Sequence, residues 1–436
     1  MSSGRRADLV VAGVEAVLVA AAVAVGAVLN GRGVPLHADA APLYAVWRPH
    51  VGWGTPLAVA VAATVVLIGP GWARRARWRP LLAAGYLTAV AWTFSLALVD
   101  GWSAGLARRL TPQGEYLQEV GRVTNIPTML VTFTGGILDF QPTSWATHVA
   151  GHPPGALLVF IWLDRVGLGG GGPAAVACVL AGATVAVSVP VALRLLGDEP
   201  AARTVLPYLV LFPGAVWVGA SADGLFAGVV AAGLALLAAR GWWAGLAGGL
   251  ALGFALYLSY GFVLVGVLAL VVIVLRRSHR IRVLGTAAIG VAAVVAGFTA
   301  AGFWWLDGYD LVVRRYYQGW AADRPYAYWV WANLACLVLA AGPVLAPALR
   351  RAVVAARLPA GGIPRATVAL PLAAAVAVLA ADLSGLSKAE VERIWLPFAV
   401  WLLAAVTWLP EAARRPWLVA QAMTAIAINH LLWTAW

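Results

Sequence analysis

The stretch that decides the fold reads Thr147-His148-Val149-Ala150-Gly151-His152-Pro153-Pro154-Gly155. It ends a long polar segment and leads directly into the apolar run Ala156 to Leu163. Two consecutive prolines are typical of the first turn of a helix, where the missing N–H would have no intrahelical partner. The two histidines before them then lie where the chain passes from water into an apolar layer. An enzyme that acts on a membrane-embedded substrate would hold its polar groups at this depth.

The composition extends this interpretation to the whole chain. Of the 436 residues 62% are hydrophobic and only 11% are charged, which is typical of a polytopic membrane protein and excludes a soluble domain. A membrane-spanning helix needs ~20 mostly apolar residues, and about fourteen apolar segments, several of them short, are recognisable. They cover roughly 9–29, 57–70, 81–99, 153–166, 173–193, 204–219, 224–239, 244–258, 260–275, 283–303, 329–347, 366–381, 394–409 and 417–436.

Arginine clusters predict the orientation. More than half of the 30 basic residues fall in five clusters, which the positive-inside rule assigns to the cytoplasm. These clusters are Arg5-Arg6, Arg74 to Arg79, Arg276 to Arg282, Arg350 to Arg365 and Arg414-Arg415. An odd number of crossings must then separate residue 152 from Arg276, so segment 153–166 is expected not to span by itself. We therefore predict an all-α protein with about 13 transmembrane helices, an inner N-terminus and an outer C-terminal Trp436.

The loops assigned to the outer face hold most of the 18 acidic residues and four of the six histidines. Because the net charge of +12 follows from the topology, it does not indicate nucleic-acid binding. The two cysteines, Cys178 and Cys336, fall inside apolar segments, so neither a disulfide nor a metal site is expected. No cofactor is expected either. The protein is expected to be embedded in the lipid bilayer, with its functional site at the outer face of the membrane.

The longest outer loop, 100–152, is the first candidate for a functional site. Loops beyond ~12–15 residues are uncommon unless they have a function. This loop holds Asp100, Glu115-Tyr116, His148 and His152, and a short surface helix is expected after Pro112. The alternative is that its carboxylates only keep the loop soluble.

Two further constellations follow. In the stretch 386–398, Lys388, Glu392 and Arg393 stand at the mouth of a helix that begins near Ile394. An arginine fork binds phosphate in a bidentate manner and an adjacent glutamate can hold it in place, although an interfacial arginine may also simply reach toward water. In the stretch 314–329, aromatic and charged residues alternate. They suit either stacking on sugars or an interfacial aromatic belt.

Three motifs in this order resemble the C-type (GT-C) membrane glycosyltransferases. Gly151 to Gly155 resembles their His-Pro-Pro or Lys-Pro-Pro element, and Glu392 to Pro397 resembles their late Arg-aromatic-Leu-Pro element. Arg194 to Gly197, followed by Ser221-Ala222-Asp223, is similar to their middle section. The resemblance covers roughly residues 81–400. Within the superfamily the wording is most similar to an actinobacterial envelope group, with methylthioxylose-, mannosyl- or arabinosyltransferases as examples.

The resemblance implies a GT-C-like helical bundle with outer-face loops and short surface helices. It divides the chain into an N-terminal transmembrane hairpin with an outer loop (1–80), a catalytic transmembrane core (81–410) and a C-terminal transmembrane helix (411–436). Two features depart from the family: segments 9–29 and 57–70 form an extra hairpin, and the family's Asp-Glu pair is not intact.

The resemblance also implies a reaction, the transfer of a hexosyl or pentosyl group from a polyprenyl-phosphate donor to an envelope glycan or glycolipid. A carboxylate would deprotonate the acceptor hydroxyl, and a cation would stabilise the departing phosphate. Glu115 is the first choice for the base, Asp100 the second and Asp39 the third. Substrate binding is expected of Tyr116, His148, His152, Lys388, Glu392 and Arg393.

A transporter or a flippase for lipid-linked sugars is the alternative. Such proteins commonly show repeated halves, broken helices and ionisable groups near the middle of the bilayer. This sequence keeps most polar groups in loops on one face, with only a few deeper candidates such as Asp164 and Asp223. That pattern favours the transferase.

Overall fold

The computed structural model describes residues 3–219, 221–357 and 366–434, and nearly all of this part of the chain that is regular is helical. The first group of elements comprises α1 (Ser3–Gly31), β1 (Ala45–Trp47), α2 (Gly54–Arg75) and α3 (Trp78–Ala97). Short elements follow: the π-helical turn η1 (Ser103–Ala107), α4 (Leu117–Val120), α5 (Ile126–Thr132), the 3-10 turn η2 (Phe133–Gly136) and α6 (Thr147–Ala150).

The central bundle runs from α7 to α15. It comprises α7 (Pro154–Arg165), α8 (Gly171–Ala183), α9 (Val185–Leu195), α10 (Glu199–Val210), α11 (Ala215–Val218), α12 (Ala222–Ala238), α13 (Trp242–Leu256), η3 (Tyr260–Leu264), α14 (Val265–Leu275) and α15 (Arg280–Ala300). The last group comprises α16 (Trp305–Tyr316), α17 (Tyr326–Ala341), α18 (Leu345–Ala356), α19 (Ala366–Leu383), α20 (Val391–Ile394), α21 (Leu396–Leu402), η4 (Leu403–Trp408), α22 (Glu411–Leu431) and β2 (Leu432–Thr434).

The chain is a multi-pass membrane protein by helix length and apolarity. Within the described residues six helices are long and apolar enough to cross a membrane, or up to seven if the bent pair α17–α18 counts as one span. The predicted count of 13 is not confirmed, because several apolar segments of the sequence fold into helices shorter than the ~20 residues that a span requires. One of them is α7, whose 12 residues reach only about 18 Å.

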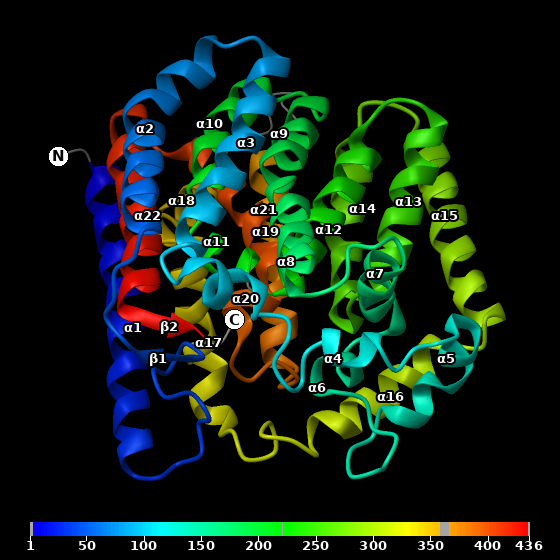
Figure 1. Cartoon of the computed structure of the whole chain (residues 1–436). Helices are drawn as coiled ribbons and strands as arrows, with labels where there is room; N and C mark the ends of the chain where they lie inside the picture. The colour runs from blue at the N-terminus through cyan, green and yellow to red at the C-terminus, as the bar shows by residue number, and fades with distance from the viewer. Residues whose placement is uncertain (1–2, 220, 358–365, 435–436) are drawn as a thin grey trace.

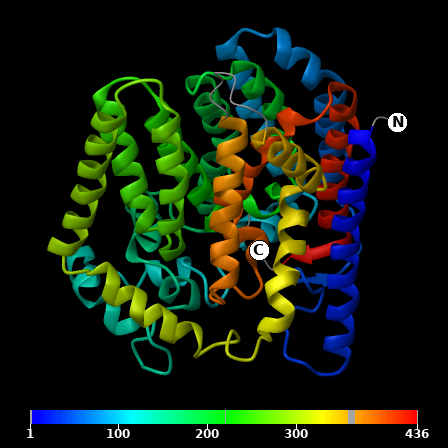
Figure 2. The ribbon, with the colours of Figure 1, turned by 180° about the vertical axis from the view of Figure 1, so that it is seen from behind.

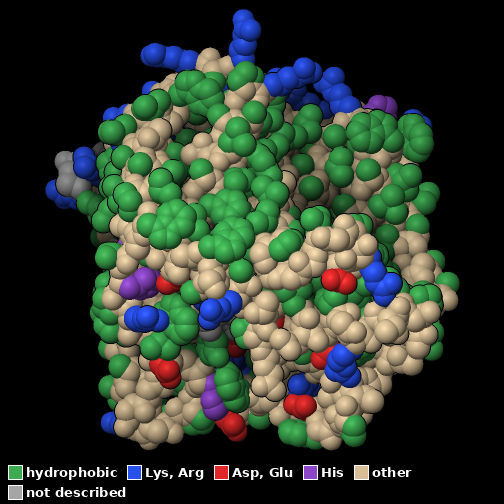
Figure 3. All heavy atoms as spheres, in the orientation of Figure 1, with side chains coloured by type: hydrophobic (Ala, Val, Ile, Leu, Met, Phe, Trp, Pro, Cys, Tyr) green, Lys and Arg blue, Asp and Glu red, His purple; other side chains and the backbone are tan. Residues whose placement is uncertain are grey.

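The two ends of the bundle differ in charge. Figure 1 shows the N-terminus, the α2–α3 turn, the α14–α15 turn and the start of α22 at one end, and the short helices α4 to α6 with α16 at the other. In the same orientation Figure 3 shows lysine and arginine side chains along the upper edge and acidic and histidine side chains in the lower half. The predicted arginine clusters therefore gather at one end, apart from residues 358–365, which lie outside the described part of the chain. The side of the membrane that each end faces remains a prediction.

Small residues allow close packing within the bundle. A Cβ atom on Gly249 of α13 would lie 2.1 Å from the carbonyl oxygen of Ala287 in α15, so only glycine permits this approach. Small residues at helix crossings are typical of membrane proteins, where van der Waals contact replaces the hydrophobic driving force.

The N-terminal hairpin is packed into the rest of the chain. Its strand β1 pairs antiparallel with β2, with Ala45 opposite Thr434 and Trp47 opposite Leu432. Helix α1 packs against α17 and α18, which meet at a bend of 96° that is visible in Figure 2. The division of the chain into 1–80, 81–410 and 411–436 stays a prediction. In the structure the three segments contact one another.

The orientation can be tested by labelling with a membrane-impermeant maleimide. The native Cys178 and Cys336 are buried, so engineered thiols should dominate the signal. Gln113→Cys, on the polar loop, should label in intact cells, whereas Arg77→Cys, in the α2–α3 turn, should label only after permeabilisation. The reverse pattern would contradict the predicted orientation. The C-terminal Trp436 lies outside the described residues, and a thiol placed after it should label like Gln113→Cys.

Candidate functional site

The His-Pro-Pro stretch folds as its sequence predicts. Pro153 has an extended backbone and Pro154 occupies the first position of α7. The next position, Gly155, requires a glycine, because a Cβ atom there would lie 2.5 Å from the carbonyl oxygen of Tyr257, at the end of α13. The two prolines therefore fix the start of α7, and the glycine seats it against α13. His148, in α6, is consequently held at a fixed place just before the helix.

His148 joins two charged residues that are far apart in the sequence. Its Nδ1 lies 3.1 Å from Oε1 of Glu115 and 3.1 Å from the carbonyl oxygen of Gly114. Its Nε2 lies 3.1 Å from a terminal nitrogen of Arg393. Because a guanidinium only donates hydrogen bonds, Nε2 must accept, which leaves the proton on Nδ1 and makes the imidazole neutral. The ring therefore donates from Nδ1 to the carbonyl oxygen of Gly114, with the Glu115 carboxylate equally near, and accepts from Arg393 at Nε2.

The Arg393 guanidinium is buried between two carboxylates. It donates to Oδ2 of Asp223 over 2.7 Å and to Oε2 of Glu390 over 2.7 Å. Burial disfavours the charged form of Arg393, but Asp223 and Glu390 outweigh it and raise the pKa of the guanidinium. Burial likewise opposes ionisation of Glu390, yet Arg393 and Arg324 lower its pKa to about 2. Arg393 and Glu390 are therefore ionised at neutral pH.

Arg324 extends this network toward the N-terminal hairpin. Its guanidinium donates to Oε1 of Glu390 over 3.1 Å and to the carbonyl oxygen of Lys388 over 2.9 Å. It also donates to the carbonyl oxygens of Leu36 and His37, each over 3.2 Å. We name this series of contacting side chains, Glu115–His148–Arg393–Glu390–Arg324, the buried polar chain. It runs from the long outer loop to the loop between α1 and β1.

The expected role of Glu392 in orienting the Arg393 fork is wrong. Its carboxylate accepts from the backbone N–H of Tyr44 over 3.1 Å, and the carboxylates on the guanidinium are Asp223 and Glu390. The physical reason is the backbone just before α20, where Glu390 has a left-handed conformation, with φ of 63°, and its carboxylate reaches the guanidinium of Arg393. Glu392 is fully buried, and this burial raises its pKa to about 7.

Lys388, which was expected to bind substrate together with Arg393, contacts Arg324 instead. Its ammonium donates to the carbonyl oxygen of Arg324 over 3.1 Å and lies 5.5 Å from the ring centre of Tyr317. Burial, followed by the nearby charge of Arg324, lowers its pKa. Lys388 thus contributes to the Arg324 end of the buried polar chain.

His152 and Tyr116 form an aromatic wall beside His148. The His152 Nδ1 donates to the carbonyl oxygen of His148 over 2.7 Å, and burial lowers the pKa of His152 to about 4, so its ring is neutral. The buried Tyr116 ring lies 5.7 Å from His152, 6.0 Å from His148 and 5.2 Å from Phe160. Burial raises the pKa of the Tyr116 phenol, which therefore remains protonated.

Asp100 belongs to a different cluster. Its two carboxylate oxygens lie 2.9 Å from Arg109 and 3.0 Å from Nε2 of His50. Arg109 in turn donates to the carbonyl oxygen of Thr434, in β2. Sequence reasoning placed Asp100 and Glu115 in one site because they share a loop, but the structure brings only Glu115 to Arg393. Asp39, the third candidate, lies in the α1–β1 loop, where its carbonyl oxygen accepts from Asn30.

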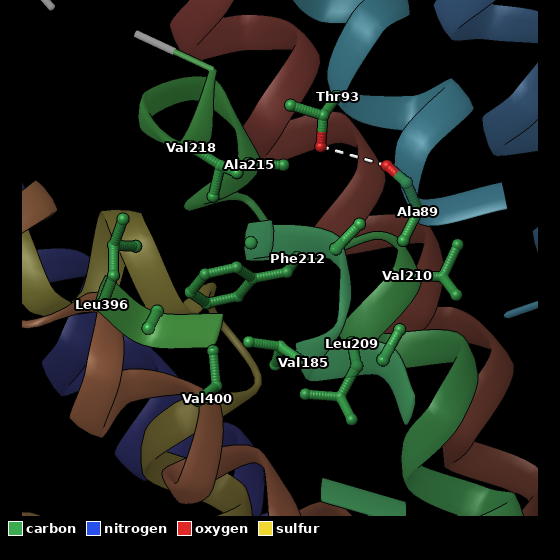
Figure 4. A pocket seen from close by; sticks show the side chains of 14 residues that line it. Ala89, Thr93, Val185, Leu209, Val210, Phe212, Ala215, Val218, Leu396 and Val400 are labelled. Carbon is green, nitrogen blue, oxygen red and sulfur yellow. Dashed lines mark hydrogen bonds between the residues drawn. The ribbon is translucent and has the colours of Figure 1, made fainter. Parts of the chain in front are cut away.

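Two cavities flank the buried polar chain. The first, drawn in Figure 4, holds about 30 Å³, room for one water at most, and its lining is apolar around Phe212 and Leu396. The second holds about 280 Å³ between α4, α7 and α8, and Phe160, Gln118 and Asp164 help to line it. Phe160 separates this second cavity from Tyr116. Among the described residues no group of three histidine, cysteine or acidic side chains is placed to hold a metal ion.

Sequence reasoning missed three members of the site. Asp223 is the one acidic residue in the apolar helix α12, Glu390 stands three positions before Arg393, and Arg324 lies in the aromatic stretch 314–329. Each was visible as a charge beside or within an apolar segment. The pairing of Asp223 with Arg393 was not visible, because it spans 170 residues, and neither was the pairing of Arg324 with Glu390, which spans 66.

Comparisons with known proteins add little to this geometry. No family model matches the chain, and no curated protein matches it. Among solved structures the chain is similar to the crystal structure of ArnT from Cupriavidus metallidurans in the apo state. The identity is 15% over 80% of this chain and 78% of that one, with a TM-score of 0.28. Because so low a TM-score does not establish a shared fold, function has to be argued from the site itself.

The buried carboxyl of Glu392 predicts a dependence of stability on pH. Because its pKa is raised from 4.5 to about 7, its contribution to stability is complete below about pH 4.5 and is lost as the pH rises through about 7. Glu392→Gln keeps the neutral form at every pH, so its melting temperature should exceed that of the wild type above pH 7 and converge with it in acid. Thermal scanning of the purified protein measures this. Glu411→Gln, on an exposed side chain, is the control, and parallel curves for Glu392→Gln and the wild type would contradict the prediction.

Proposed function

We propose that this protein is a membrane glycosyltransferase of the C type, which transfers a sugar from a polyprenyl-phosphate donor to an envelope glycan or glycolipid. The reaction would take place at the outer face of the membrane. The observation that carries the proposal is the buried polar chain. It brings a carboxylate and a neutral imidazole of the long loop together with a guanidinium, and Figure 1 shows α6, which holds the imidazole, at the end of the bundle opposite the α2–α3 turn.

The proposed reaction needs one base and one cation. The acceptor hydroxyl oxygen bonds to C1 of the donor sugar while the bond from C1 to the phosphate oxygen breaks. The hydroxyl proton passes to Glu115, and the electron pair of the broken bond leaves with the polyprenyl phosphate. Negative charge thus grows on the phosphate during the step, and a fixed guanidinium such as Arg393 would stabilise it there.

Two features support these assignments. Glu115 is only 4% exposed and lies beside the donor N–H of His148, so its carboxylate is held in one orientation. Asp223 of α12 and Glu390, just before α20, fix the plane of the Arg393 guanidinium from two distant parts of the chain. Electrostatic stabilisation is most effective where such groups are preorganised away from water. His148, His152 and Tyr116 would then position the sugar and the phosphate.

One observation favours a transporter or flippase as the second candidate. Glu15 of α1 is 5% exposed within a candidate membrane span, and it accepts from the backbone N–H of Ala346 over 3.2 Å, just after the bend between α17 and α18. A buried acid beside a broken helix is typical of transport pathways. The two candidates differ in their reaction, because only the transferase turns over a donor when purified in detergent.

Arg393→Lys tests the phosphate site. Lysine keeps the charge that Asp223 and Glu390 require, but loses the planar fork, so transfer should fall at least about tenfold while the protein still folds. Transfer from a synthetic polyprenyl-phosphate sugar measures this, normalised to the folded fraction. Arg315→Lys, in the ion pair with Asp139 outside the buried polar chain, is the matched control. Unchanged transfer in Arg393→Lys would remove Arg393 from the reaction.

Glu115→Gln tests the base. The amide keeps the shape of the carboxylate but cannot take up the acceptor proton, so turnover should fall ~10²–10⁴-fold while donor binding persists. Asp100→Asn should retain turnover per folded molecule. Glu119→Gln is the matched control, because Glu119 is an equally buried carboxylate that binds Arg122 and the backbone of Ala146. Full activity in Glu115→Gln with an inactive Asp100→Asn would move the base to Asp100, and full activity in both would exclude the loop from the chemistry.

A further inference from the structure

A large aromatic ring lies exposed just beyond the Arg324 end of the buried polar chain. Trp320 is 53% exposed, in the segment between α16 and α17. A tight turn presents it, because the backbone N–H groups of Asp323 and Arg324 both donate to its carbonyl oxygen over 3.1 Å. Figure 1 shows this segment and the α1–β1 loop at the same end of the molecule.

The N-terminal hairpin supports this ring. The imidazole of His37 stacks on Trp320 with ring centres 5.0 Å apart and planes 4° from parallel, and Tyr44 lies at 6.3 Å. His37 has a left-handed backbone, with φ of 50°, which costs energy for a residue other than glycine. Arg324 holds this backbone in place, because its guanidinium donates to the carbonyl oxygens of Leu36 and His37. The stacked pair is therefore preorganised.

A carboxylate lies at the edge of the stacked pair. The Asp323 side chain is 61% exposed, and its Oδ2 is 3.7 Å from Nε2 of His37. An exposed indole offers a broad apolar surface on which the C–H face of a sugar ring can pack. The carboxylate at its rim can accept hydrogen bonds from the sugar hydroxyls, while the imidazole, whose Nε2 is buried, supports the indole ring by stacking on it.

We propose that Trp320, with His37 and Asp323, forms a subsite that binds a sugar ring of the acceptor glycan. The inference rests on the proposed transferase function and extends it. Arg324 links the subsite to the reaction centre, because the same guanidinium binds the His37 carbonyl oxygen and Glu390, which contacts Arg393. Two hydrogen bonds, from Arg324 to Glu390 and from Arg393 to Glu390, thereby connect the subsite to the guanidinium of the reaction centre. A mere interfacial anchor would not require the stacked imidazole or the carboxylate.

Direct binding to the purified full-length protein tests the subsite without requiring turnover. The probes are α-linked mannose and α-linked arabinose tetrasaccharides, followed by saturation-transfer NMR in detergent. Trp320→Ala should weaken binding of the better probe at least about tenfold, as loss of a central aromatic contact does. Trp242→Ala is the matched control, since Trp242 is 54% exposed at the start of α13, at the opposite end of the bundle. Equal affinity in Trp320→Ala and the wild type, or no binding of either probe to the wild type, overturns the subsite.

Two further variants separate recognition from folding. Asp323→Asn leaves the ring in place and should weaken binding severalfold. His37→Asn removes the stacked imidazole but retains a residue that tolerates the left-handed backbone. In the transfer assay, Trp320→Ala should raise the KM for the acceptor about tenfold and leave the KM for the donor unchanged. Glycan binding without any transfer by the wild type would retain the subsite and exclude the transferase.

Discussion

The site depends on one buried cation. Arg393 neutralises Asp223 from α12 and Glu390 from the turn before α20, and it donates to His148 from the long loop. Because Glu390 also binds Arg324, removing the Arg393 cation would leave the buried Asp223 carboxylate uncompensated, a change that typically costs about 3–5 kcal/mol. The contacts of Arg393 therefore join three distant parts of the chain. They also fix the orientation of the guanidinium that would bind a phosphate. Stability and chemistry are coupled at this residue.

The sequence predicted what local physics determines. The prolines at 153–154 mark the start of α7, the arginine clusters gather at one end, and Glu115, His148 and Arg393 come together. It failed where the outcome depends on distant partners. Glu392 was chosen over Glu390 because it adjoins Arg393, although the left-handed backbone just before α20 brings the Glu390 carboxylate to the guanidinium. The count of 13 spans is not confirmed, because apolarity does not show where a helix ends, and several apolar segments fold into helices shorter than a span requires.

The N-terminal hairpin looked like an addition to the core, yet its loop contributes to the site. Carbonyl oxygens of Leu36 and His37 accept from Arg324, and the N–H of Tyr44 donates to Glu392. These are backbone groups, which carry no signature in the sequence. The loop therefore contributes through the course of its backbone, and the residues at its turns determine that course. This explains why composition alone could place the hairpin but could not assign it a role at the site.

The pairing of β1 with β2 has a consequence for biogenesis. Residues 45–47 are synthesised and inserted long before residues 432–434 leave the ribosome, so the early strand must wait for nearly the whole chain. During that time its backbone groups are unpaired at the membrane surface, which is the condition under which a strand edge binds foreign segments. The loop that supports Arg324 lies directly before this strand. The pairing of β2 with β1 therefore also completes the surroundings of the loop that supports Arg324.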